Sequence, residues 1–229
     1  MTYEFLVLAC LFLVPGLLIW LLRPDLRGLM KRAVLLSLPF AATEWLFYPA
    51  YWTPRFLFNL ADHLGFGLED VLFVAGLGAF CSTAYAVVFR RTVVPRGDTV
   101  RPWARALGAI GLMLAGAGLL VVAGLPILYA SVVAMVAGSG GVLGARPDLR
   151  LPSLGGALSS MGIYLGLSLV FELLVPGVYT RTWRPSLLLH GHVLGVPLDE
   201  LLYGLGSGLA ATAFPAWALG LRFVPYTAR

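Results

Sequence analysis

The sequence predicts an all-α membrane protein, a polytopic bundle of seven transmembrane helices, on three observations. The chain of 229 residues is 59% hydrophobic and 12% charged, about half the charged fraction of a soluble domain, and its mean hydropathy is +0.88. The loops between its apolar runs are short. Each run is close to the roughly 20 residues that a helix needs to cross the hydrocarbon core. The runs are 3–22, 29–49, 68–89, 103–123, 125–145, 153–175 and 197–221.

These runs must be helices because lipid offers no partner for unpaired backbone N–H and C=O groups. Little more than Gly124 and Pro126 separates the fourth run from the fifth, so these two should form a tight hairpin. Glycine patterns within the runs indicate close contacts between helices. The patterns are Gly76 with Gly78, Gly111 with Gly116, and Gly204 with Gly206 and Gly208.

The basic residues indicate how the chain is oriented. If the N-terminus lies outside, every lysine and arginine except Arg55, Arg181 and Arg184 falls on the cytoplasmic side. The positive-inside rule therefore predicts a multi-pass protein of the cell membrane with an outer N-terminus and a cytoplasmic C-terminus. This topology explains the formal charge of +5 without a nucleic acid partner. An aromatic belt is expected at the outer interface from Tyr48, Tyr51, Trp52, Tyr179 and Trp183.

Two segments on the outer side form an internal repeat. The first copy reads EWLFYPAYWTPR at 44–55 and GFGLEDVLF at 65–73, and the second reads ELLVPGVYTRTWRP at 172–185 and GVPLDELLY at 195–203. Each copy has an acid late in a helix, then a loop with aromatic residues and proline, then an acidic pair at the start of the next helix.

The repeat divides the chain into three parts. Residues 1–90 form a first three-helix repeat, 91–123 a connector helix, and 124–229 a second three-helix repeat. One connector restores the direction of the chain, so both repeats should cross the membrane the same way. Such parallel repeats are related by an axis along the membrane normal.

Six acids of the repeat are the candidate catalytic residues: Glu44, Glu69, Asp70, Glu172, Asp199 and Glu200. The two acidic pairs are explained equally well as helix caps, because free N–H groups and the helix dipole stabilise acids there. Capping does not explain Glu44 and Glu172, which should lie inside their helices. An ionisable group at that depth is costly and indicates a function.

Acids gathered in an apolar site suit one kind of chemistry. Carboxyl groups that repel each other away from water retain protons at neutral pH, and a protonated carboxyl group is a general acid. Ionised neighbours and the faces of Trp and Tyr rings can stabilise a cation formed by protonation. These properties suit the protonation of an alkene in a lipid-soluble polyene. We expect no cofactor and no metal, since Cys10 and Cys81 lie in apolar runs without the spacing of a zinc site.

The repeated segments resemble the domain of the non-flavin, membrane-integral carotenoid cyclases, the heterodimeric bacterial and fused archaeal and fungal lycopene cyclases. Residues 195–203 fit the Gly-x-Pro-Leu-Glu-Glu type of helix start, and 65–73 fit it with Gly67 in place of proline. The resemblance covers 32–89 and 153–221 and so implies two copies of the domain. It implies a lycopene β-cyclase that isomerises its polyene substrate without flavin. Because the second copy fits better, Asp199 and Glu200 are favoured as the proton donor.

Two other functions remain open on the sequence. A membrane prenyltransferase also uses acid clusters, to hold Mg²⁺ and diphosphate, but its acids would be spaced about one helical turn apart. A transport or other non-catalytic protein could keep the same fold, because proton-relay carboxylates look similar in sequence. An apolar, polyene-sized cavity beside the acids would favour the enzyme, and a water-filled path would favour the transporter.

Overall fold

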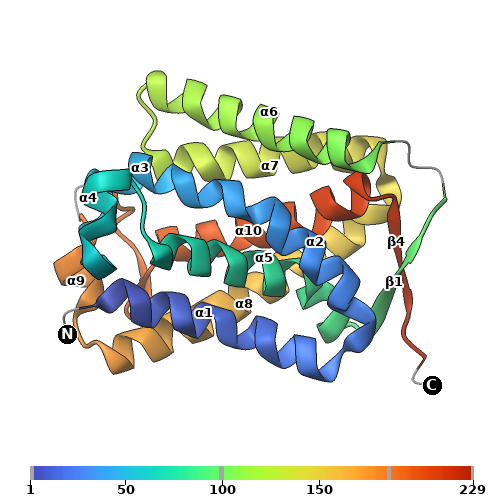
Figure 1. The fold of residues 1–229 in the computed structure, drawn as a ribbon, viewed down its shortest axis with the longest axis horizontal. Coiled ribbons are helices and arrows are strands. Elements are labelled where there is room, and N and C mark those ends of the chain that lie inside the picture. Colours follow the sequence, from blue (N-terminus) through green and yellow to red (C-terminus); the bar gives the residue numbers. More distant parts are fainter. Residues whose placement is uncertain (1–2, 98–100, 185–186, 228–229) are drawn as a thin grey trace.

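The computed structural model describes residues 3–97, 101–184 and 187–227, so Pro185 of the second loop motif lies outside the described residues. Most of this chain is helical, and the long helices lie side by side in an elongated bundle (Figure 1). The helices are α1 (Glu4–Leu22), α2 (Arg27–Ser37), α3 (Glu44–Phe47), α4 (Leu60–Leu64), α5 (Leu68–Val88), α6 (Pro102–Val122), α7 (Ile127–Ala145), α8 (Arg150–Leu174), α9 (Val178–Thr182) and α10 (Leu198–Ala218). The strands are β1 (Arg91–Pro95), β2 (His192–Val193), β3 (Val196–Pro197) and β4 (Leu221–Pro225).

Five helices among the described residues are long and apolar enough to cross a membrane: α1, α5, α6, α7, and α8 with the turn before it. The predicted run 29–49 is interrupted, because a 3₁₀ segment at Leu38–Thr43 separates α2 from the short α3. Pro39 lies at the start of that segment and cannot donate a backbone hydrogen bond. The seven-span topology stays a prediction.

The two central helices, α5 and α10, pack on each other and on the remaining helices. α1 and α2 pack on α5, while α7 and α8 pack on α10. Glycine allows this close approach: a Cβ on Gly76 would lie 2.6 Å from the carbonyl oxygen of Phe12, and one on Gly208 would lie 2.8 Å from that of Gly156. The prediction of close contacts through these glycines is confirmed.

Helix α6 is packed differently. It lies at the edge of the bundle, against α7 (Figure 1). A Cβ added to Gly111 or Gly116 would meet no atom of the described residues within 4 Å. The predicted close helix contact at these two glycines is therefore wrong, because α6 covers the bundle without packing tightly through them. The predicted hairpin from α6 to α7 is present, and Gly124 turns it with a φ of +94°.

Helices α1 and α7 are each followed by an arginine that precedes a proline, and the same contacts occur in both places. A proline disfavours helical geometry in the residue before it. In the first turn, Arg23 donates to both carboxylate oxygens of Asp25, at 2.9 and 2.8 Å, and to the backbone oxygen of Arg91, at 2.5 Å. Arg27 reaches back to the carbonyl of Trp20 at 2.8 Å. These bonds join the α1–α2 turn to strand β1.

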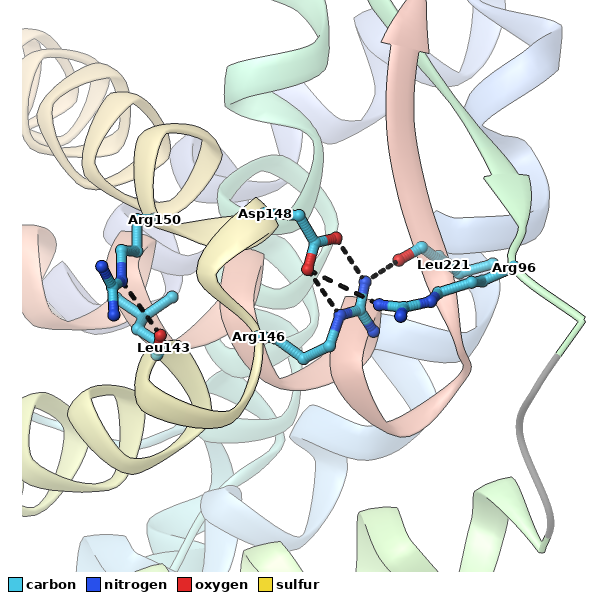
Figure 2. Close-up of polar contacts among 6 residues, drawn as sticks. All are labelled: Arg96, Leu143, Arg146, Asp148, Arg150 and Leu221. Atoms are coloured by element: carbon cyan, nitrogen blue, oxygen red, sulfur yellow. Dashed lines mark hydrogen bonds and ion pairs between the residues drawn. The ribbon is translucent and has the colours of Figure 1, made fainter.

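The second turn repeats this arrangement (Figure 2). Arg146 donates to both oxygens of Asp148, each at 2.7 Å, and to the backbone oxygen of Leu221 at 2.9 Å. Arg150 reaches the carbonyl of Leu143 at 3.2 Å, and Asp148 also pairs with Arg96 at 3.7 Å. These bonds join the α7–α8 turn to strand β4.

Strands β1 and β4 form an antiparallel ribbon, in which Val93 lies opposite Phe223. The sequence analysis did not predict this ribbon. β1 follows α5 and β4 follows α10, so the ribbon connects the ends of the two central helices. In Figure 1 it lies at one end of the bundle, opposite α3, α4 and α9.

Candidate active site

The candidate acids lie at the end of the bundle where α3, α4 and α9 gather (Figure 1). Helices α5 and α10 begin at this end, and α8 finishes there. By segment, the acids are Glu44 at the start of α3, Glu69 and Asp70 in the first turn of α5, Glu172 in the last turn of α8, and Asp199 and Glu200 in the first turn of α10.

Glu44 and Asp70 are neighbours in the wall of one cavity, close enough for their carboxyl groups to interact. Both are buried, with 7% and 3% of their surfaces exposed. Trp52 Nε1 donates to Glu44 Oε1 at 2.6 Å, and the Gly67 N–H donates to Asp70 Oδ2 at 2.7 Å. Ionised carboxylates only accept hydrogen bonds, so a bond between two carboxyl groups needs a proton on one of them. The geometry therefore fits a pair that holds a transferable proton.

Glu200 is surrounded by hydrogen-bond donors. Trp183 Nε1 and the Tyr51 hydroxyl donate to Oε1 at 2.8 and 3.2 Å, and the Tyr164 hydroxyl donates to Oε2 at 2.6 Å. Donors to a carboxylate favour its charged form against the cost of burial. Burial raises the pKa of the Tyr51 phenol, and the charges of Glu200 and Asp199 raise it further, so Tyr51 keeps its proton. Three donors thus fix the position of the Glu200 carboxyl group in the cavity wall.

The two aromatic loops pair with each other and bring these groups together. Trp52 and Trp183 face each other in an antiparallel bridge, with ring centroids 5.0 Å apart. The Thr53 N–H donates to the Thr182 carbonyl at 2.9 Å, and the Arg184 N–H donates to the Tyr51 carbonyl at 3.1 Å. The tryptophan that binds Glu44 therefore lies beside the tryptophan that binds Glu200.

The expected aromatic belt is wrong for most of its members. Tyr51, Trp52, Tyr179 and Trp183 are buried inside the protein. They lie there because three of them donate hydrogen bonds to Glu44 or Glu200 and the fourth, Tyr179, donates to the backbone of α8. Tyr48 is at the surface, where its hydroxyl donates to Asp62 at 3.1 Å.

One cavity is lined by Glu44, Asp70 and Glu200. Aromatic rings form much of its wall, among them Phe5, Phe47, Trp52, Tyr164, Trp183 and Tyr203. A second, larger cavity lies between α2, α5, α6, α7 and α10 and is lined almost wholly by apolar side chains. The two cavities share the wall residues Phe40, Thr43, Phe47, Val74 and Tyr203, so the apolar space adjoins the acids.

Glu69 and Asp199 face away from this cavity, toward the loops before their helices. Glu69 Oε1 accepts the Leu57 N–H at 2.5 Å, and Asp199 accepts the Leu189 N–H at 3.2 Å. Asp199 also accepts the Tyr129 hydroxyl. The first acid of each adjacent pair therefore binds the loop that precedes its helix.

Glu172 binds its own loop. Its Oε1 accepts the Gly177 N–H at 2.6 Å, at the turn between α8 and α9, and the side chain is half-buried. The cavity wall, as far as the chain is described, contains Glu44, Asp70 and Glu200 from the six predicted acids.

Sequence reasoning missed Tyr164 as a site residue. It lies in the middle of α8, is 2% exposed and donates the shortest of the three bonds to Glu200. A signal was present: a hydroxyl within a long apolar run needs a buried partner, and a polar side chain at such depth marks a candidate site.

A comparison with protein-family models matches part of the chain. Residues 126–218 match the family model described as lycopene cyclase, a region that includes Tyr164, Trp183 and Glu200. No curated protein and no solved structure matches the chain. This region is therefore similar to the lycopene cyclase family, and the match supports a role as a carotenoid cyclase with a lipophilic carotenoid substrate.

Proposed function

We propose that the chain is a flavin-independent lycopene β-cyclase of the membrane-integral type, with two copies of the cyclase domain related as parallel repeats. One observation carries this proposal: the Glu44–Asp70 pair and Glu200 line the same aromatic-walled cavity. The cavity adjoins a larger apolar one. An acid, a counter-charge and an apolar channel are what acid-catalysed closure of a polyene end needs.

The reaction follows from these groups. The carboxyl pair gives its proton to the terminal double bond of the linear end, and a tertiary carbocation forms. A second double bond of the same chain attacks this cation, forming the ring bond and moving the positive charge to a ring carbon. Loss of a proton from the neighbouring carbon restores a double bond. One proton is gained and one is lost, so the substrate is isomerised with no change in oxidation state.

We assign the proton donor to Glu44–Asp70, although the sequence alone favours Asp199–Glu200. Glu44 and Asp70 face the same cavity as neighbours, and two carboxyl groups can hydrogen-bond to each other only when one of them carries a proton. Glu200 instead accepts three donors, and Asp199 binds a loop. Glu200 is therefore suited to stabilise the cation, together with the faces of Trp52 and Trp183.

The other acids have supporting roles. Glu69 and Asp199 hold the loops that position the tryptophans, and Glu172 holds the turn before α9. The prenyltransferase alternative is disfavoured because adjacent acids diverge: Asp70 faces the cavity while Glu69 faces the loop. Only one acid of each adjacent pair therefore faces the cavity.

The test is cyclisation of lycopene by the purified protein in lipid nanodiscs made in D₂O. We expect one deuterium in each ring formed, because the added proton comes from a carboxyl group that exchanges with solvent, whereas the lost proton comes from another carbon. The pigments are separated by chromatography, and their deuterium content is measured by mass spectrometry. Rings without deuterium would contradict the acid mechanism, and absence of rings with protein that remains folded would contradict the cyclase.

A further inference from the structure

Helix α6 has two faces of different character. Its inner face contributes alanines to the larger cavity, among them Ala109 and Ala117. Its outer face carries large side chains, and Leu112 and Leu119 are 75% and 72% exposed. In a membrane Leu112 and Leu119 meet lipid, whereas Ala109 and Ala117 meet the cavity together with the larger side chains of Ile110, Met113 and Leu114.

Small residues on a membrane helix normally let a neighbour pack closely, and here they do not. A cavity remains between α6 and the helices opposite, where α10 also contributes small side chains, Ala210 and Ala211. The small side chains of α6 and α10 therefore widen a space.

This space is long and apolar, and it adjoins the acid site. On α10 its wall runs from Tyr203, shared with the acid cavity, to Ala218, a length of about 22 Å at the helical rise of 1.5 Å per residue. Two of its hydroxyl groups already have partners, since Ser37 donates to the Val34 carbonyl and Ser207 to the Met135 sulfur. The wall therefore suits an extended hydrocarbon.

We propose that this cavity binds the polyene chain of the substrate lengthwise along the inner face of α6, with one end group at the acids. The inference rests on the proposed function and extends it: the substrate enters end-on, and one end is cyclised in each binding event. The alanines of α6 then set the width available to the chain. Ala109 lies about 12 Å along the helix from Ala117, which is nearer the acids, at 1.5 Å per residue.

The test fills the cavity at Ala109 and leaves the acids untouched. Ala109→Trp places a large ring in the channel, and Ala109→Leu a smaller side chain. Leu112→Trp adds the same ring to the lipid-facing side of the same helix and serves as the matched control. Two quantities are measured in nanodiscs: the lycopene that remains bound per protein, by absorbance, and the cyclisation rates of lycopene and of a linear polyene half as long with the same end group.

We expect Ala109→Trp to reduce both the binding and the cyclisation of lycopene by about tenfold or more, and Ala109→Leu to reduce them less. The half-length polyene should be cyclised at a rate close to that of the unmodified protein, and Leu112→Trp should change neither substrate. Lycopene binding unaffected by both Ala109 variants would overturn the proposal, as would an equal loss of both substrates. If the unmodified protein binds lycopene but cyclises nothing, the proposed function fails, while the binding difference between Ala109→Trp and Leu112→Trp still decides the cavity.

Discussion

Glu44→Gln removes the acid of the carboxyl pair and keeps the contacts of its side chain. The amide oxygen of glutamine can accept the Trp52 N–H, now 2.6 Å from Glu44 Oε1. The amide nitrogen can donate to the neighbouring carboxyl group of Asp70. Neither partner loses its hydrogen bond, so the fold should tolerate the change, but an amide does not release a proton.

The losses of stability and of activity expected of Glu44→Gln differ in size. Replacing a charged or acidic hydrogen bond by a neutral one costs on the order of 1 kcal/mol of unfolding free energy. General acid catalysis contributes about 10²- to 10⁴-fold, which corresponds to about 3–5 kcal/mol of activation free energy. We therefore expect Glu44→Gln to unfold within a few degrees of the unmodified protein and to cyclise lycopene at least about 100-fold more slowly.

The assay measures initial rates of ring formation in nanodiscs and thermal unfolding of the same samples. Glu172→Gln is the matched control, because Glu172 binds its own loop at Gly177. It should retain cyclisation close to that of the unmodified protein. A Glu44→Gln variant that kept more than half of the rate would refute the assignment of the proton donor.

Three further predictions concern the site and the opposite end of the bundle. Glu200→Gln should destabilise the protein by about 1–3 kcal/mol, more than Glu44→Gln, because the amide offers one acceptor oxygen to three donors. Thermal unfolding and pigment analysis measure this, and equal stability of the two variants would contradict the prediction. Arg146→Met should lower the free energy of unfolding by about 1–3 kcal/mol, since it leaves the buried Leu221 carbonyl without this donor. An unchanged midpoint of thermal unfolding would contradict a stabilising role of Arg146. The hydrogen bond from Arg23 holds the pKa of Asp25 below its ordinary value of 3.8. The unmodified protein should therefore be more stable than Asp25→Asn above that pH, and this difference should disappear as the pH falls through the lower pKa of the folded state. A difference in stability that does not depend on pH would contradict this prediction.

Apolar runs predicted the helices well, because a helix is the structure that satisfies its backbone in lipid. The interruption at Leu38–Thr43 was harder to predict, since Pro39 is tolerated in many membrane helices. The ribbon of β1 with β4 was missed because its strands are short and pair only when α5 and α10 end side by side. The sequence Arg-Pro-Asp-Leu-Arg occurs at 23–27 and again at 146–150. This repetition would have predicted that the α1–α2 and α7–α8 turns lie at the same end of the bundle, where the ribbon forms.

The candidate acids could be found from the repeat, but their separate tasks could not. Glu69 and Asp70 are adjacent in sequence, and only their opposite directions on α5 separate a loop contact from a cavity contact. Glu44 and Glu172 occupy matching positions in the two sequence copies, yet one contacts Asp70 and the other Gly177. Sequence similarity between repeats does not reveal such a difference, because it depends on which loop each side chain meets.

The division of the site between the two halves has a consequence for redundancy. Glu44 and Asp70 come from residues 1–90, whereas Tyr164, Trp183 and Glu200 come from residues 124–229. In a duplicated fold, one copy can often replace the other when a mutation removes a side chain, but here each half would supply site residues that the other lacks. Loss of either carboxyl function should then be uncompensated, and two halves produced as separate chains should be inactive singly and active only when they assemble.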